Sequence, residues 1–156
     1  MKVHIELFQV AMDGFEACYR KTVVDATGSD RDPDEVVAGY LACPDGEPGD
    51  PVLVHSTSWR YAPDGSLVLT YLALVGCAAR LGESSQRADL RAVELPASRG
   101  PRCPRPAEIR EEHVLAHGLR HLAFLEQAQG TVGTYLGARA ANHFADLAPA
   151  PAGRLA

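Results

Sequence analysis

The feature that most constrains the fold is a pair of β-rich runs, VLVHSTSWRYAPDGSLVLTYLALV, at residues 52–75. The tetrapeptide Ala62-Pro63-Asp64-Gly65 joins them. Proline presets the backbone angle that opens a turn, and glycine supplies the positive φ that a type I turn with a bulge requires. The sequence therefore predicts a β-hairpin at the centre of the fold, about residues 52–75.

The turn also predicts which residues face each other across the hairpin. With a loop at 63–65, the expected pairs are Tyr61 with Leu67, Trp59 with Leu69, Thr57 with Tyr71, and His55 with Ala73. Because side chains alternate along a strand, this aromatic face is expected to be buried. The opposite face is expected to carry Ser56, Ser58 and Arg60.

Other segments also have recognisable patterns. KVHIELFQVAM, at residues 2–12, alternates as a half-buried strand does, and Asp32-Pro33 followed by Glu35 is a good helix start. The segment at 13–26 is ambiguous: Asp13 with Glu16 resembles a capping box and favours a helix, whereas Thr22, Val23 and Val24 favour a strand. Helix is the expectation there. Helices are also expected at about 106–129 and 131–146, after a long connection at 82–106 with one short strand near 91–95.

This order of elements predicts an α+β fold: an antiparallel sheet around the hairpin, helices packed on one side, and two C-terminal helices. The chain has 156 residues, which suits one domain, expected at 1–146, with 147–156 as a frayed C-terminal tail. Its 46% hydrophobic and 22% charged residues are ordinary for a globular protein.

Three histidines stand four residues apart in REEHVLAHGLRHLAFL, at 110–125: His113, His117 and His121. Two histidines at this spacing on a helix can bind zinc jointly, so a metal-binding protein is one alternative. However, Arg110 and Arg120 share their sector of the helix, and positive charge there disfavours a dication. No metal site is therefore expected, and no cofactor is named by the sequence.

The same sector suits an anion better. Arginine offers paired donors to phosphate or carboxylate, and histidine adds donors that become charged near neutral pH. If this helix crosses the polar face of the hairpin, the two sets of groups converge on one cleft. We therefore expect a small phosphate- or carboxylate-bearing ligand at Ser56, Ser58, Arg60, Arg110, His113, His117, Arg120 and His121.

A second alternative is a homodimeric interaction protein without catalytic activity. Phe124 lies in the same Arg- and His-rich sector, and aromatic and arginine residues are enriched at protein interfaces. Phosphate-binding, dinucleotide-binding and serine-hydrolase motifs are missing from the sequence, so nothing identifies a reaction, and whether the protein is an enzyme stays open.

Charge and cysteine content narrow the range of possible partners and the cellular compartment. Residues 1–50 hold 4 of the 15 basic and 11 of the 20 acidic side chains, which argues against nucleic-acid binding. No apolar run is long enough to span a bilayer, so no membrane association is expected. The four cysteines are widely spaced and, without an export signal, are expected to be reduced thiols in the cytoplasm.

Overall fold

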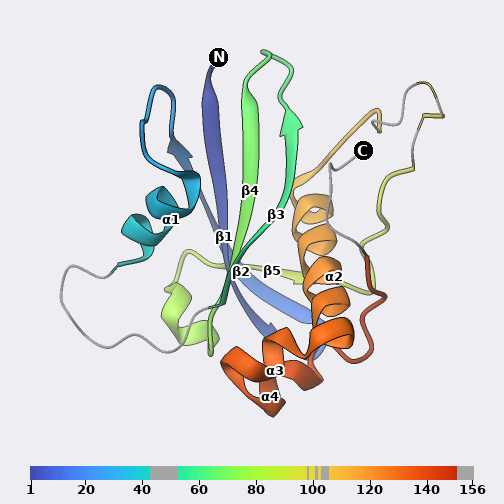
Figure 1. Cartoon of the computed structure of the whole chain (residues 1–156). Helices are drawn as coiled ribbons and strands as arrows, with labels where there is room; N and C mark the ends of the chain where they lie inside the picture. The colour runs from blue at the N-terminus through green and yellow to red at the C-terminus, as the bar shows by residue number, and fades with distance from the viewer. Residues whose placement is uncertain (43–52, 98, 101, 103–105, 151–156) are drawn as a thin grey trace.

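A computed structural model describes residues 1–42, 53–97, 99–100, 102 and 106–150. A five-stranded mixed sheet has the order β3-β4-β1-β2-β5 (Figure 1). The elements are β1 Val3–Asp13, β2 Glu16–Asp25, α1 Pro33–Leu41, β3 Leu53–Tyr61, β4 Leu67–Leu74, a 3₁₀ turn η1 Ala78–Leu81, β5 Gln86–Asp89, α2 Glu111–Gln129, α3 Thr131–Leu136 and α4 Ala138–Asn142. The expected α+β class is confirmed.

The expectation of a helix at 13–26 is wrong, because this segment is β2 and forms a hairpin with β1. Asp13 pairs with Glu16, which leaves Gly14 and Phe15 as a two-residue loop. Gly14 has φ +60°, while no residue other than glycine in the described chain has positive φ. This is the pattern of a type II′ hairpin turn. The Asp-Gly pair is therefore a turn signal rather than a helix cap.

The central hairpin of β3 and β4 is confirmed, and its register is as expected near the turn, where Tyr61 pairs with Leu67 and Trp59 with Leu69. Farther from the turn, a bulge at Thr57 shifts the register, so that Ser56 pairs with Tyr71 and His55 pairs with Leu72. Only part of the expected aromatic face is buried. Tyr71 is 5% exposed, whereas Trp59 and Tyr61 are 39% and 47% exposed because β3 lies at the sheet edge.

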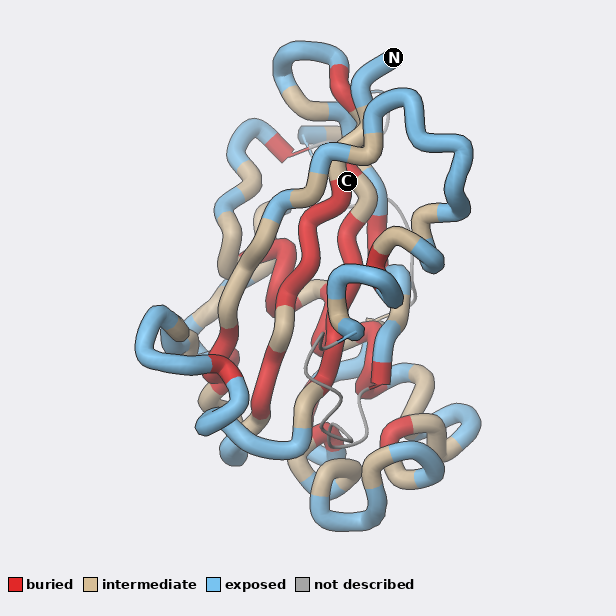
Figure 2. Tube along the Cα trace, turned by 90° about the vertical axis from the view of Figure 1, so that its left-hand side faces the viewer, coloured by how far each residue is buried: buried red, intermediate tan, exposed pale blue. Residues whose placement is uncertain are grey.

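Two hydrophobic layers cover the two faces of the sheet. On one face Phe8, Val10 and Leu72 pack against α2. On the other face Ile5, Leu7, Tyr71 and Ala73 pack against Val37 of α1. Neighbouring strand residues point to opposite faces, so α1 and α2 lie on opposite sides of the sheet (Figure 1). The helices thus divide between the faces instead of sharing one, and the buried stretches run through the central strands (Figure 2).

The C-terminal part differs from expectation mainly in its boundaries. The short strand is β5 at Gln86–Asp89 rather than 91–95, and α2 begins at Glu111 rather than near 106. Gly137, at φ +88°, separates α3 from α4 where one helix was expected. Leu147 is buried, and the backbone N–H of Ala150 donates to the carbonyl of Arg120. Residues 151–156 of the expected tail lie outside the described residues. Within the described chain, no helix is long and apolar enough to cross a membrane.

Candidate functional site

Helix α2 packs directly against the β3–β4 hairpin, as the expected cleft requires. A Cβ built on Gly118 would lie 2.7 Å from Leu72 Cδ1 and 3.2 Å from Thr57 Oγ1. One turn further along the helix, the rings of His121 and His55 are stacked with centroids 5.1 Å apart. The glycine therefore allows the helix to approach the sheet closely and brings the histidines onto β3.

The bulge at Thr57 divides the row of polar side chains expected on β3. Ser58 pairs with Thr70 and Arg60 with Val68, so both belong to the face that α2 covers. Ser56 pairs with Tyr71 instead and belongs to the opposite face, towards α1. The structure therefore brings Ser58 and Arg60 to the helix side and removes Ser56 from the expected cleft.

The three arginines of the expected site are all engaged by protein groups. Arg60 donates to Glu6 Oε1 at 2.6 Å and to Thr70 Oγ1 at 3.3 Å. Arg110 forms an ion pair with Glu112 at 3.1 Å, and Arg120 donates to the carbonyl of Val93. These partners occupy donors of all three arginines, although the Arg110 side chain remains 57% exposed.

Two of the three histidines of α2 are almost fully buried: His113 and His121 are 5% and 4% exposed. Both ring nitrogens of His113 lie 3.1 Å from nitrogen atoms of Arg110. His121 Nδ1 lies 3.3 Å from the carbonyl oxygen of Ala150, and its Nε2 lies 3.0 Å from Nε2 of His55. Because a carbonyl only accepts, Nδ1 of His121 carries the proton and the neutral Nε2 accepts from His55.

Burial favours the neutral form of this histidine group. It is the main cause that lowers the pKa of His55, His117 and His121, since a desolvated imidazolium is disfavoured. At His55 and His117 the proximity of His121 lowers the pKa further. Asp34 opposes the shift at His55, and the bond to Ala150 opposes it at His121.

Between α2 and the sheet, four buried polar atoms have no hydrogen-bond partner among the residues that the structure describes: Glu6 Oε2, Ser58 Oγ, Glu111 Oε1 and His117 Nε2. Lys21 bridges the two carboxylates, 3.7 Å from Glu6 Oε1 and 3.1 Å from Glu111 Oε2. In the described chain, no three histidine, cysteine, aspartate or glutamate side chains are placed to hold a metal ion. Buried polar atoms of this kind are commonly satisfied by ordered water.

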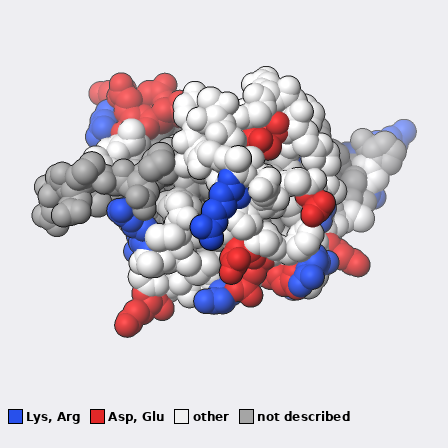
Figure 3. Space-filling model, turned by 90° about the horizontal axis from the view of Figure 1, so that it is seen from below, with Lys and Arg blue, Asp and Glu red and all other residues white. Residues whose placement is uncertain are grey.

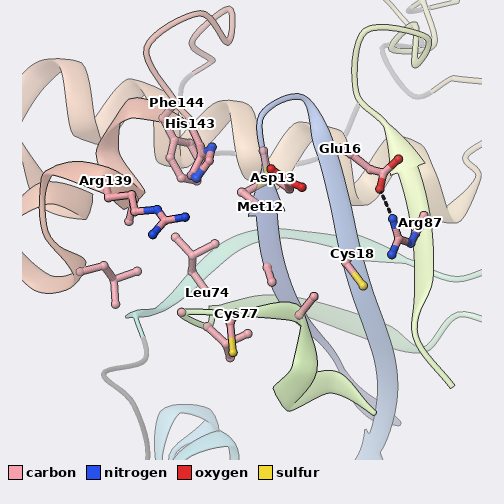
Figure 4. Close-up of a pocket in the computed structure, with 16 residues that line it drawn as sticks. Met12, Asp13, Glu16, Cys18, Leu74, Cys77, Arg87, Arg139, His143 and Phe144 are labelled. Atoms are coloured by element: carbon pink, nitrogen blue, oxygen red, sulfur yellow. Dashed lines mark hydrogen bonds and ion pairs between the residues drawn. The ribbon is translucent and has the colours of Figure 1, made fainter. Parts of the chain in front are cut away.

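A cavity that could hold a small ligand lies elsewhere, beside α3 and α4, and has a volume of about 460 Å³ (Figure 4). The cavity is at the carboxyl ends of β1 and β4, the parallel pair of the sheet. Ligand sites of open α/β sheets occupy the same position relative to parallel strands. Its volume falls in the usual range for small-molecule pockets. Part of its wall is apolar, made by Met12, Leu74, Leu136 and Phe144.

The polar groups of this cavity differ in whether they are already paired. Glu16 and Arg87 form an ion pair at 2.5 Å. Arg139, from α4, has no hydrogen bond or ion pair in the described structure, and neither does the carboxylate of Asp13. Arg139 and His143 reach in from the α4 side, and Asp13 from the β1 side (Figure 4).

His143 is fixed in one tautomer by the β1–β2 turn. The backbone N–H of Gly14 donates to His143 Nδ1 at 3.0 Å. The neutral ring therefore carries its proton on Nε2, which can donate to a ligand. This bond also ties the end of α4 to the hairpin turn across the cavity wall.

A second, smaller cavity of about 340 Å³ contains Ser56, the residue that the bulge moved away from α2. Tyr71 donates to Asp34 Oδ1 at 2.5 Å in its wall. Desolvation, followed by the hydrogen bond to Asp34, raises the pKa of Tyr71. The Tyr71–Asp34 bond joins α1 to the sheet, so the polar groups here serve the fold.

Sequence reasoning missed the larger cavity because its lining comes from β1, β2, β4, β5, α3 and α4. One signal was available: Arg139 and His143 are four apart, so they share a helix face. No protein-family model, curated protein or solved structure shows significant similarity to this chain.

Proposed function

We propose that the protein binds a small carboxylate- or phosphate-bearing ligand in the cavity beside α4. The observation that carries the proposal is Arg139, a guanidinium that lines the cavity without an acidic partner in the described chain. A planar guanidinium matches the two oxygens of a carboxylate, and His143 Nε2–H supplies a further donor. The proposal keeps the anionic ligand expected from the sequence and moves its site.

The proposed setting is a reducing compartment, the cytoplasm. Cys18 and Cys77 line the same cavity and are free thiols. Free thiols persist where glutathione and thioredoxin keep them reduced. At the end of the molecule that carries α3 and α4, basic and acidic side chains are interspersed (Figure 3), which suits a small ligand better than a nucleic acid.

The test is calorimetric titration and thermal shift with acetate, 4-methylpentanoate, citrate and inorganic phosphate. At a concentration one hundred times its Kd, a ligand stabilises the folded state by about 2.7 kcal/mol. We expect at least one of these anions to raise Tm and Arg139→Gln to abolish the rise. Arg31→Gln, an exposed arginine near α1, is the matched control and should bind as the unchanged protein does. The proposal is contradicted if Arg139→Gln binds as the unchanged protein does, or if none of these anions binds.

A second candidate is a homodimer formed through the edge strand β3. Val54, Trp59 and Tyr61 on this strand are each more than a third exposed, and so is Phe124 on α2. A nine-residue edge strand can pair with a second copy of itself in antiparallel fashion. Light scattering at high protein concentration tests this: a dimer that Tyr61→Arg converts to a monomer supports it, and a monomer throughout removes it.

A further inference from the structure

We infer that the ligand of the larger cavity is a zwitterion, a small apolar α-amino acid or a compound with the same ammonium and carboxylate groups. The inference rests on the proposed function, because it takes Arg139 as the carboxylate-binding group. It adds a role for Asp13 and for the apolar wall.

The charged groups of the cavity favour a ligand that carries both signs of charge. Glu16 and Arg87 neutralise each other, which leaves one cation, Arg139, and one anion, Asp13, among the described residues that line the cavity. They lie in one cavity but no ion pair joins them in the described chain. A ligand with a single negative charge satisfies Arg139 and leaves Asp13 unpaired, whereas a ligand with both charges satisfies both.

The two unpaired charges come from different walls of the cavity. Asp13 ends β1 beside the hairpin turn, whereas Arg139 belongs to α4 (Figure 4). His143 accepts a hydrogen bond from the N–H of Gly14, the residue after Asp13, and so connects the α4 side of the cavity with the β1 side. Its Nε2–H supports a carboxylate bound by Arg139, because the Gly14 bond leaves that proton free to donate.

The apolar part of the cavity wall suits an uncharged side chain on the ligand. Met12 and Leu136 contribute accessible apolar surface to the cavity, and the buried side chains of Leu74 and Phe144 lie behind them. Burial of an aliphatic or aromatic group against these residues adds affinity that a bare phosphate does not obtain. Asp13 also repels a dianion such as phosphate. The cavity therefore favours a monocarboxylate with an ammonium group and an apolar side chain.

The experiment compares matched probes that differ by one charged group. The first set is L-leucine, its deaminated analogue 4-methylpentanoate and its decarboxylated analogue 3-methylbutylamine. The second set is L-phenylalanine, 3-phenylpropanoate and 2-phenylethylamine. Calorimetry on the full chain should show at least one amino acid binding roughly tenfold or more tightly than both of its analogues, since each charged contact is lost in one analogue.

Two variants test which side chain binds the ammonium group of the ligand and which binds its carboxylate. Asp13→Asn should abolish the advantage of the amino acid over its deaminated analogue and leave binding of that analogue unchanged or tighter. Arg139→Gln should weaken the amino acid and the deaminated analogue together. Circular dichroism and Tm of both variants should match the unchanged protein, because neither side chain has a partner in the described chain.

The outcomes separate this inference from the proposed function. If the deaminated analogues bind as tightly as the amino acids and Arg139→Gln abolishes binding, anion binding stands and the zwitterionic ligand is overturned. If no probe in either set and no anion of the earlier panel binds, both are overturned.

Discussion

Two arginines beside the same sheet have opposite surroundings. Arg60 lies between the sheet and α2, with a side chain only 16% exposed, and donates to Glu6 and Thr70. Arg139 lies at the carboxyl ends of β1 and β4, is exposed and has no partner in the described chain. The residue type is the same, but Arg60 stabilises the fold whereas Arg139 is available to a ligand. The comparison shows that polar composition alone does not locate a binding site.

The largest difference between the regions should appear when each arginine is removed. Arg60→Ala leaves the buried Glu6 carboxylate with Lys21 as its one cationic partner among the described residues, so it should lower the free energy of unfolding by about 3 kcal/mol. Arg139→Ala should change it by less than about 0.5 kcal/mol. Urea unfolding of both variants measures this, and equal losses would contradict the contrast.

A smaller effect is expected from the close contact between α2 and the sheet. Gly118→Ala places a Cβ 2.7 Å from Leu72 and should cost about 1–3 kcal/mol more than the matched helical variant Gly133→Ala. At Gly133 the nearest atom is the flexible end of Glu126, 3.2 Å away. The gain in helix propensity is the same for both variants and cancels. Equal stability of the two would show that the helix can move away from the hairpin at no cost.

The buried histidines His55, His117 and His121 should make the stability of the protein depend on pH. The folded-state pKa values of His55, His117 and His121 are lowered from 6.5, so below about pH 6.5 the unfolded chain binds protons that the folded protein does not. Stability is therefore complete above that pH and falls as the pH drops towards the folded-state values, by at most about 1.4 kcal/mol per pH unit for each histidine. Urea unfolding at pH 7.5, 6.5 and 5.5 checks this. The double variant His55→Gln, His121→Gln should show a shallower slope, and an unchanged slope would exclude this pair as its source.

The smallest effect is expected at His143. Its bond to the N–H of Gly14 is near the surface, so His143→Ala should lower the unfolding free energy by about 0.5–1 kcal/mol. The same variant should weaken binding of 4-methylpentanoate if Nε2–H contacts the carboxylate. A loss of stability much larger than this would place His143 with the histidines of α2 as a group that serves the fold.

Local signals predicted the fold well where they act over a few residues. The Pro63-Asp64-Gly65 turn gave the correct pairs next to it, and Asp32 caps α1 as expected, accepting from the N–H of Asp34. The error at β2 had a local cause: Asp13 and Gly14 suit both a helix start and a hairpin turn. Only the neighbouring strands decide between the two, and they are distant in sequence.

The candidate site was less predictable for a physical reason. An unpaired bulge residue leaves no pattern in the sequence, yet the bulge at Thr57 determined which of Ser56 and Ser58 faces α2. The sequence places the histidines in one sector of the helix with Arg110 and Arg120, but it does not show that β3 and the segment at Ala150 cover this sector. Whether a charged side chain has a partner is a property of the assembled fold, so Arg139 could not be distinguished from the other arginines.

The parallel pairing of β1 with β4 has a consequence for the order in which the chain folds. Val3 pairs with Leu67, and the hairpin partner β2 follows β1 directly. During synthesis at about 5–20 residues per second, the β1–β2 hairpin therefore leaves the ribosome several seconds before β4. Throughout this interval one edge of β1 has no neighbour, although Ile5 and Leu7 are fully buried at the end. The strand at the centre of the finished sheet begins as an open edge, and open strand edges are prone to aggregation until they are paired.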